Sequence, residues 1–166
     1  MRVMGVDPGT HRMGFGVLET SGRDVKVVIC GTIRANSRDP IAKRLLHMFE
    51  SLQKNIQSYK PDALAIESLF FAKDVRAVER IGEARACAML AASKEGIEVI
   101  EYAPTAVKRS VTGNGRGSKE QVQFMVKRLL NLKEAPALDA SDALAIALCH
   151  AHSARQVKCI NTLQVK

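Results

Sequence analysis

The sequence predicts a single α/β domain built on a mixed β-sheet of five strands. Three apolar segments with short links open the chain, and two short apolar runs come later. Segments with helical periodicity separate and follow those later runs. The predicted order is therefore three strands, a helix, a strand, a helix, a strand and further helices. The length of 166 residues suits one domain with a substantial core.

The first predicted strand ends in an acid. Residues 1–6 form a largely apolar run that leads to Asp7, and Pro8 and Gly9 then force a turn. Because aspartate is depleted in strands and costly to bury, this carboxylate needs a partner. Taken alone, Asp7 is equally compatible with an Asx-type residue that closes the turn and with a metal ligand. A metal site requires that other acids reach the same point.

The second and third predicted strands cover Arg12–Leu18 and Val25–Cys30, with a turn at residues 21–23. Their short connections predict antiparallel pairing that continues from the first strand. Gly14 and Gly16 alternate along the second strand and therefore share a face. They leave room for another element to approach that face closely.

A helix and a second strand with a terminal acid follow. Asp39 is the expected N-cap of a helix whose apolar stripe covers residues 41–56. The next strand, Asp62–Glu67, is a short apolar run, which predicts burial on both faces and a central, partly parallel position. It ends in Glu67, just as the first strand ends in Asp7.

The next helix is predicted over Asp74–Lys94 and is rich in alanine. Its small residues allow close helix packing, which is compatible with core packing and with a subunit interface. A short strand over Glu98–Tyr102 follows, and Pro104 then opens a brief helix. A loop rich in glycine at residues 112–117 comes next.

Two further helices complete the predicted domain. Ser118, with a glutamine three residues later, is a capping-box signature for the first of them. The last helix is amphipathic and is expected from Ala143 to about Ser153. Residues 1–154 would then form the domain, and residues 155–166 a basic, loosely ordered tail.

The cysteines and the hydropathy pattern predict a cytoplasmic protein. The four cysteines are scattered without C-x-x-C spacing, which is typical of reduced thiols. No stretch approaches about 18 uncharged apolar residues, and the amino terminus lacks a signal-peptide pattern. Cys149, His150 and His152 could form a soft metal site, but their position at the end of an apolar helix favours core and capping roles.

Basic residues are in excess and are concentrated in one segment. The net charge is +8, which favours a polyanionic partner such as nucleic acid. Between Thr105 and Leu130 there are six cations and one acid. The cations are Lys108, Arg109, Arg116, Lys119, Lys127 and Arg128. Lys119 begins a capped helix after the loop, which suits a phosphate site but also a tolerated surface lysine.

Four carboxylates are placed where they can meet. Asp7 and Glu67 end strands, and Asp139 and Asp142 are three residues apart at the start of the last helix. Strand ends and helix starts meet at the functional edge of an α/β sheet. Each acid alone also has an ordinary explanation, as a helix-capping or solvated rim residue.

Taken together, these acids favour a nuclease. Four converging carboxylates repel one another unless cations neutralise them, and such hard oxygen ligands suit Mg²⁺ or Mn²⁺. Two such ions about 3.5–4 Å apart can activate a water and stabilise the leaving oxygen of a phosphodiester. The acids would hold metal while the cations of the basic segment hold phosphate.

Four stretches of the chain carry a family resemblance: MGVDPGT followed by GFGV, ALAIESLFFAKD, VKRSVTGNGRGSKEQVQFMV and LDASDALAIALCHAH. They resemble the RuvC Holliday-junction resolvases, which have an RNase H-like fold of the retroviral integrase superfamily. The stretches span nearly the whole chain in the family's order. The resemblance implies a mixed five-stranded sheet, its first three strands antiparallel, with helices on both faces.

The resemblance also implies roles for individual residues. The acidic tetrad that would bind two Mg²⁺ ions per active site, with Mn²⁺ as a substitute, is Asp7, Glu67, Asp139 and Asp142. Some relatives have a histidine in the last acid pair, whereas both members here are aspartate. Basic residues near the scissile phosphate match Lys108 and Lys119, the latter with a catalytic role. An aromatic that meets bases at the opened junction matches Phe70. Arg109 and Arg116, from the same basic segment, complete the predicted DNA-binding set.

The implied activity is a Mg²⁺-dependent endonuclease that nicks two opposing strands of a four-way DNA junction in recombination and repair. A homodimer would make two symmetry-related cuts and leave 5′-phosphate and 3′-hydroxyl ends that a ligase can seal. The two-fold symmetry of the junction gives the dimer a physical basis, and the helix at 74–94 is the candidate for part of its contact. RuvA and RuvB as branch-migration partners are implied by the resemblance alone.

Three other functions are weighed against this one. A sugar-kinase or actin-like nucleotide-binding domain shares the opening strand, acid and glycine turn, but it needs a second related half for which 166 residues leave no room. A metal-free DNA-binding module of the same fold would bind without cleaving. A nuclease for RNA–DNA hybrids is the nearest alternative within the fold.

Overall fold

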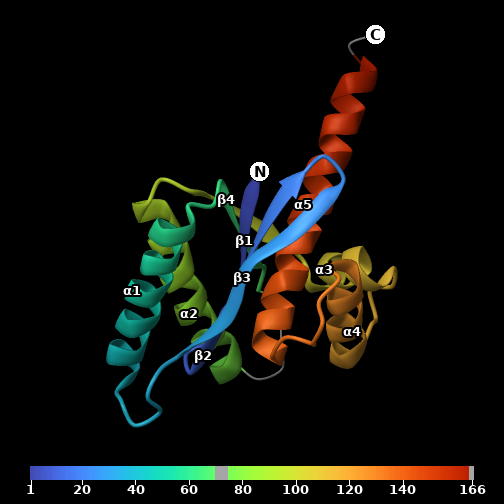
Figure 1. Ribbon diagram of the computed structural model, residues 1–166. Coiled ribbons are helices and arrows are strands. Elements are labelled where there is room, and N and C mark those ends of the chain that lie inside the picture. Colours follow the sequence, from blue (N-terminus) through green and yellow to red (C-terminus); the bar gives the residue numbers. More distant parts are fainter. Residues whose placement is uncertain (70–74, 165–166) are drawn as a thin grey trace.

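One five-stranded sheet contains every strand in residues 1–69 and 75–164, the part of the chain that the computed structural model describes (Figure 1). The strands are β1 Arg2–Asp7, β2 Arg12–Ser21, β3 Asp24–Arg34, β4 Ala63–Glu67 and β5 Glu98–Tyr102, in the spatial order β3-β2-β1-β4-β5. β1, β2 and β3 pair antiparallel, whereas β4 and β5 run parallel to β1. The predicted mixed sheet is confirmed.

Helices cover both faces of this sheet (Figure 1). They are α1 Ile41–Tyr59, α2 Val75–Lys94, α3 Pro104–Thr112, α4 Lys119–Leu129 and α5 Leu138–Gln164. α1 and α2 pack on one face through residues such as Met48 and Ala88. α3, α4 and α5 pack on the other face through residues such as Val107, Val126 and Leu144. No described helix is long and apolar enough to span a bilayer.

The hairpin of β2 and β3 is longer than predicted. β2 continues to Ser21 and β3 runs from Asp24 to Arg34, with Ser21 paired to Asp24. Gly22 adopts a φ of 56° in the turn, a conformation that glycine reaches without strain. The residues that extend β2 beyond Leu18 are polar or charged, so a prediction from hydropathy ends this strand too early. β3 is longer mainly at its other end, where residues 31–34 pair with residues 12–15 of β2.

The predicted N-cap of α1 is wrong. The helix begins at Ile41 with Pro40 as the cap residue, and no side chain caps it. The Asp39 carboxylate instead accepts from the Lys43 ammonium group at 3.1 Å. A charged partner one turn into the helix thus replaces the expected backbone partner of the carboxylate.

The last helix is also longer than predicted. α5 continues to Gln164, whereas the amphipathic pattern indicated an end near Ser153. Residues 154–164 contain neither glycine nor proline, the residues that usually stop a helix. In Figure 1 this part of α5 projects beyond the sheet. The division of the chain into a domain at 1–154 and a tail at 155–166 stays a prediction.

Three glycines let α5 lie directly on the sheet. Gly5 of β1 and Gly14 and Gly16 of β2 face the first turns of this helix. A methyl group on Gly5 would overlap the carbonyl oxygen of Ala143, and one on Gly14 would overlap that of Asp139. The close approach predicted at Gly14 and Gly16 is confirmed, and the approaching element is α5.

Substitution of Gly5 by alanine should therefore destabilise the protein. The added methyl group meets helix backbone that has no rotamer to change, so we expect Gly5→Ala to lower the free energy of unfolding by about 1–3 kcal/mol. Gly82→Ala is the matched control, because its nearest contact would be Leu69 Cδ1 at 3.7 Å. Urea unfolding followed by circular dichroism measures both changes. Equal stability of the two variants would show that the α5 contact is not tight.

Candidate active site

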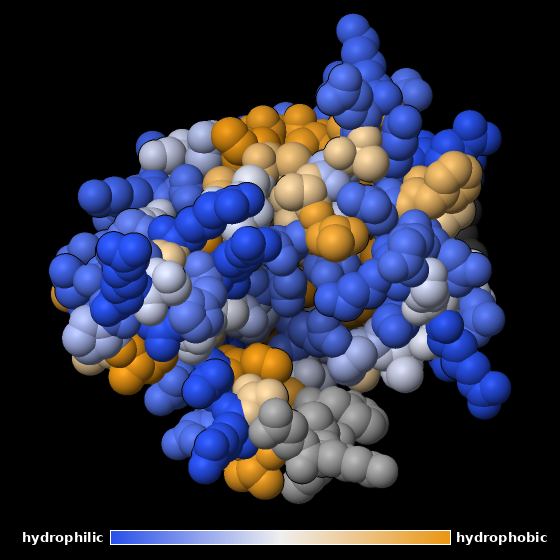
Figure 2. Space-filling view, turned by 90° about the horizontal axis from the view of Figure 1, so that it is seen from below, coloured by the Kyte–Doolittle hydropathy of each residue, from blue (hydrophilic) through white to orange (hydrophobic). Residues whose placement is uncertain are grey.

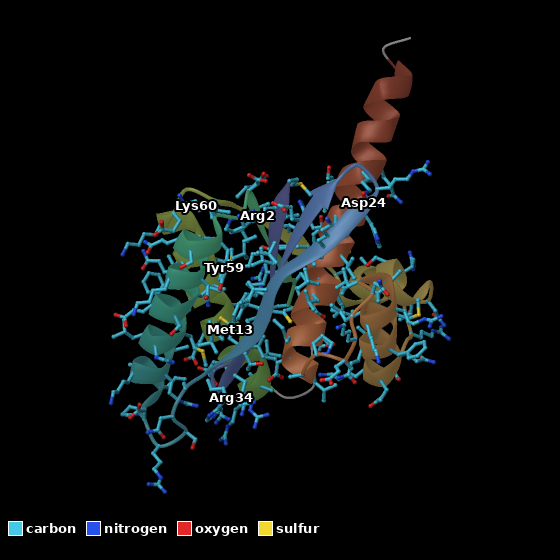
Figure 3. All side chains as sticks on the ribbon, in the orientation of Figure 1. Arg2, Met13, Asp24, Arg34, Tyr59 and Lys60 are labelled. Carbon is cyan, nitrogen blue, oxygen red and sulfur yellow. The ribbon has the colours of Figure 1, made fainter. Side chains whose placement is uncertain are left out.

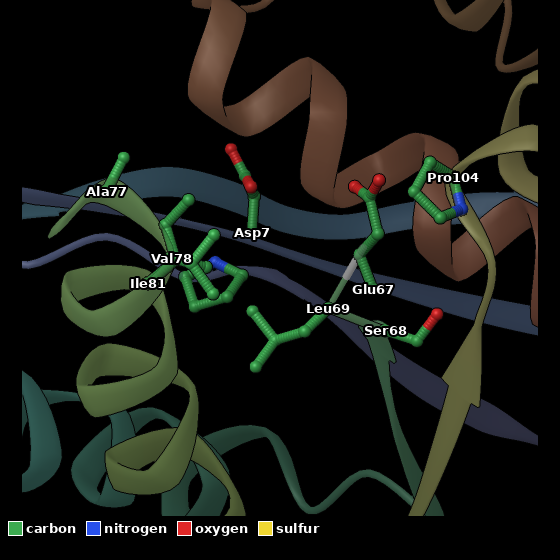
Figure 4. Close-up of a pocket in the computed structure, with 9 residues that line it drawn as sticks. Asp7, Glu67, Ser68, Leu69, Ala77, Val78, Ile81 and Pro104 are labelled. Atoms are coloured by element: carbon green, nitrogen blue, oxygen red, sulfur yellow. The ribbon is translucent and has the colours of Figure 1, made fainter. Parts of the chain in front are cut away.

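Asp7 and Glu67 are neighbours at the ends of two parallel strands. In the pairing of β1 with β4, Val6 lies opposite Ile66, and the two acids follow directly. Val6 and Ile66 enter the core beneath α1 and α2. Because side chains alternate along a strand, Asp7 and Glu67 point to the face that α5 covers. Figure 4 shows both carboxylates directed toward that helix.

The start of α5 brings two more acids to this point. Gly14 pairs with Asp7 across β1 and β2, and the backbone of Asp139 lies against Gly14. Asp139 and Asp142 are three residues apart near the start of α5 and share a face of the helix. The four predicted acids thus come from three elements that are distant in sequence. They meet at the lower edge of the sheet, which Figure 2 views from below.

Burial and mutual repulsion disturb these acids. Burial raises the pKa of Asp7 to about 7, and the charges of Asp142, Glu67 and Asp139 add to the increase. Burial also raises the pKa of Glu67, with Asp142 as the next cause, and it raises the pKa of Asp142. Each carboxylate makes ionisation of another more costly. The set therefore favours binding of a positive charge.

Two of the predicted lysines supply part of that charge. Lys119 Nζ lies 3.5 Å from Asp142 Oδ2, and the charge of Asp142 raises the pKa of this lysine. Lys108 lowers the pKa of Glu67 and of Asp142. Lys119 is the first residue of α4, and the predicted capping box between Ser118 and Gln121 is present there. The capped helix start thus holds the lysine over the acids.

Two hollows meet at the acids. One, of about 270 Å³, is lined by Asp7, Glu67, Lys108, Lys119 and Asp142 together with apolar residues of α3, α4 and α5. The other, of about 240 Å³, has an apolar wall from α2, formed by Ala77, Val78 and Ile81 (Figure 4). Asp7, Glu67 and Pro104 line both. A charged chamber and an apolar chamber therefore lie on the two sides of the same carboxylates.

Sequence reasoning missed the apolar chamber. Ile81 is 42% exposed and, together with Val78, lines the hollow beside the acids. The buried side of α2 is formed by small residues instead: Ala84, Ala88, Ala91 and Ala92. The run of alanines is the signal that marks the packed side, because only small residues allow close contact with α1 and the sheet.

The acids suit a hard divalent cation by their chemistry. Carboxylate oxygens are the ligands that Mg²⁺ and Mn²⁺ prefer. The raised pKa values of Asp7, Glu67 and Asp142 mean that ionising these acids is costly, and a bound cation would offset that cost. Within the described ranges, no three acidic, histidine or cysteine side chains stand close enough together to enclose an ion. The carboxylates would have to turn inward to complete a coordination shell.

The remaining residues predicted to contact DNA lie away from the acids or outside the described residues. Arg109 follows Lys108 on α3 but lines a different hollow from the acids. Arg116 is exposed in the loop before α4, where its backbone N–H donates to Asn114 Oδ1 at 3.0 Å. Phe70 lies outside the described residues. The roles assigned to all of these side chains stay predictions.

The cluster of Cys149, His150 and His152 has structural partners. Cys149 is buried in the core on the α5 side of the sheet. His150 Nδ1 lies 2.9 Å from the Tyr102 hydroxyl, and burial lowers the pKa of His150. These contacts agree with the packing role that the sequence favoured for Cys149 and His150.

Comparison with known proteins decides the family. The sequence model of a family described as crossover junction endodeoxyribonuclease RuvC matches residues 3–150. The chain belongs to the RuvC family. RuvC of Rhizobium johnstonii is 44% identical over 153 residues, which cover 92% of this chain and 90% of the relative. RuvC of Pelotomaculum thermopropionicum is 45% identical over 153 residues, covering 92% and 93%.

Solved structures agree with this assignment. RuvC of Thermus thermophilus in complex with a Holliday junction substrate is 32% identical, with a TM-score of 0.87 over 94% of this chain and 96% of that chain. The yeast mitochondrial Holliday junction resolvase Ydc2, 11% identical with a TM-score of 0.62 over 89% of this chain and 76% of that chain, shares the fold alone. The predicted RuvC resemblance, the RNase H-like fold and the enzyme class, an endonuclease for DNA crossover junctions, are confirmed. The nucleotide-binding and metal-free alternatives are set aside.

The pKa of Asp7 predicts how stability depends on pH in metal-free protein. Its ordinary value of 3.8 rises to about 7 in the folded state, so the folded protein binds this proton more tightly than the unfolded chain. The stabilising contribution is complete below the ordinary value and is lost as the pH rises through 7. Asp7→Asn should therefore raise the melting temperature by several degrees near pH 8 and hardly change it near pH 4.

Thermal melts in a chelator across this pH range provide the measurement. Asp24→Asn is the control, because Asp24 is an exposed acid at the opposite end of the sheet (Figure 3). The difference in melting temperature between Asp24→Asn and the unchanged protein should be the same at every pH. A difference in melting temperature that does not change with pH for Asp7→Asn as well would contradict the raised pKa of Asp7.

Proposed function

We propose that this protein resolves four-way DNA junctions by paired, symmetric nicking of opposing strands, with hydrolysis at the site of Asp7, Glu67, Asp139 and Asp142. The observation that carries the proposal is the convergence of Asp7, Glu67 and Asp142 with Lys108 and Lys119 beside one hollow. Asp139 is near enough for its charge to raise the pKa of Asp7 and of Asp142. Family membership supplies the enzyme class. The products would carry 5′-phosphate and 3′-hydroxyl ends that a ligase can seal in recombination and repair.

The four acids would hold two Mg²⁺ ions, with Mn²⁺ as a substitute. Bound at this site, such ions would activate a water molecule and stabilise the negative charge that develops on the leaving oxygen. Asp7 is the most constrained ligand, because β1 holds it between Gly14 on β2 and Glu67 on β4. Asp139 and Asp142 come from a helix that the glycine contacts hold in place. Rigid mounting keeps the acids aligned while DNA binds and leaves.

The two lysines would bind the scissile phosphate. Lys119 is exposed over most of its side chain, at 71%, and is therefore accessible to a substrate while it pairs with Asp142. A phosphate oxygen arriving between the lysines and the acids would exchange one anionic partner of Lys119 for another. Electrostatic stabilisation of the charge that develops on this phosphate is the chemical contribution of Lys119.

A homodimer would place two such sites on opposing strands of the junction. The outer side of α2 supports this arrangement, because Val75 and Leu90 are exposed there while the alanines of the same helix are buried. Phe70 would meet the bases at the opened centre of the junction. We further propose a cytoplasmic location, which the unpaired cysteines of the described residues support. An association with RuvA and RuvB completes the proposal.

The central experiment uses a synthetic four-way junction with symmetric, end-labelled arms and Mg²⁺. We expect paired nicks in opposing strands that ligase can seal, and a loss of at least about a hundredfold in rate with Asp7→Asn. Asp24→Asn is the matched control and should cleave normally, since Asp24 lies at the far end of the sheet (Figure 3). Unpaired nicks, or equal cutting of RNA–DNA hybrids, would contradict junction resolution while leaving a nuclease activity in place.

Phe70→Ala separates base contact from metal binding. The variant should lose junction cleavage by about tenfold or more, since stacking on an unpaired base is worth about 1–3 kcal/mol. It should keep the stabilisation by Mg²⁺ that thermal melts detect, because no acid is altered. Unchanged cleavage would assign Phe70 to packing instead.

A further inference from the structure

A third hollow, separate from the acids, lies between α3 and α5. It measures about 690 Å³ and shares no lining residue with the two hollows at the active site. Two guanidinium groups, one imidazole and three hydroxyl groups line it: Arg109, Arg155, His152, Tyr102, Ser110 and Ser153. No carboxylate is among its described lining residues. The chemistry of this hollow is that of a site for an oxyanion.

Arg155 supplies the strongest indication of a missing ligand. Its Nε and Nη2 atoms are buried and have no hydrogen-bond partner among the described residues. Buried guanidinium nitrogens without an acceptor are costly, whereas the two oxygens of a phosphate match the parallel N–H donors of Nε and Nη2. The side chain is therefore positioned for an anion that the protein itself does not supply.

The other polar groups of the hollow are held in place by the protein. Ser110 Oγ donates to the backbone carbonyl of Val107 at 2.8 Å, and the Tyr102 hydroxyl lies 2.9 Å from His150 Nδ1. Burial and the charge of Arg155 lower the pKa of His152. The two bonds hold part of the lining between α3 and α5 in place.

The position of the hollow suits the DNA that the active site would cut. On α3, Lys108 lines the catalytic hollow and the next residue, Arg109, lines this one. Along α5, Ser153 lies eleven residues after Asp142, a rise of about 16 Å at 1.5 Å per residue. That length corresponds to roughly five phosphates of one strand, at about 3.4 Å each along a duplex. A single arm of a junction can reach both places.

We propose that this hollow binds a backbone phosphate of the DNA arm that leads away from the cleavage point, with Arg155 as its main ligand and Arg109 as the second. The inference rests on the proposed function. It adds a contact at a distance from the acids, on residues that neither hold metal nor touch the scissile phosphate. Its effect is on binding and not on the chemical step.

The test measures binding of a four-way junction as a function of salt, in a chelator so that the DNA stays intact. Arg155→Gln should weaken binding about tenfold near 0.1 M salt and reduce the slope of log affinity against log salt by about 0.9, the value for one lost phosphate contact. Lys54→Gln is the matched control, because it removes one exposed charge from α1 on the other face of the sheet. It should change neither quantity.

A second measurement observes Arg155 directly in the unchanged protein. The Nε–H NMR signal of Arg155 in the unchanged protein should shift when junction DNA is added, and Arg155→Lys identifies the signal. Circular dichroism confirms that each variant is folded. Equal affinity and salt slope of Arg155→Gln and the unchanged protein, or an NMR signal that DNA does not move, would overturn the inference.

Two further outcomes are distinguishable. A shift of the Arg155 signal with inorganic phosphate, together with unchanged DNA affinity of Arg155→Gln, would assign the hollow to a free anion and overturn the DNA contact. Failure of the unchanged protein and of Lys54→Gln to bind the junction at all would contradict the proposed function itself. Normal binding by both, with a selective loss in Arg155→Gln, supports the phosphate site.

Discussion

The contact between α5 and the glycine face of the sheet is the constraint on which the rest of the structure depends. Side chains at positions 5, 14 and 16 would lift the helix away from β1 and β2. The helix would then carry Asp139 and Asp142 away from the strand-borne acids. The three glycines, which lack side chains, thus determine how far the helix-borne acids lie from the strand-borne acids. A packing feature, with no chemistry of its own, sets the geometry of the site.

The same contact creates an electrostatic conflict. It brings carboxylates together at a partly buried edge, where burial and neighbouring charge raise the pKa of Asp7 to about 7. Lys108 and Lys119 relieve the repulsion only in part, since the pKa values of Glu67 and Asp142 stay raised. The folded protein stores this unfavourable energy, and a cation that binds between the acids releases it. Local instability and readiness to bind are two results of one arrangement.

Much of the fold and of the acid convergence could be predicted from local pattern. An acid at the end of an apolar run marks Asp7 and Glu67, and Ser118 with Gln121 marks the start of α4. The choice between two local partners could not be predicted: Asp39 pairs with Lys43, four residues along, in place of capping α1. The hollows could not be predicted either, because each is lined by residues of several elements whose spacing depends on the packed core. Arg155 lies in the segment that the sequence predicts to be a tail. Only the structure, in which α5 continues to Gln164, shows that two of its nitrogens are buried.

The projecting part of α5 extends beyond the sheet (Figure 1), whereas the first turns of the same helix carry Asp139 and Asp142. The glycine contacts hold those first turns against β1 and β2, with Asp139 directly on Gly14. Asp7 and Glu67 are held by the pairing of the strands. A load on the projecting part would therefore act on a segment that is mechanically separated from the acids, and the spacing of the site would be kept while that segment contacts other molecules.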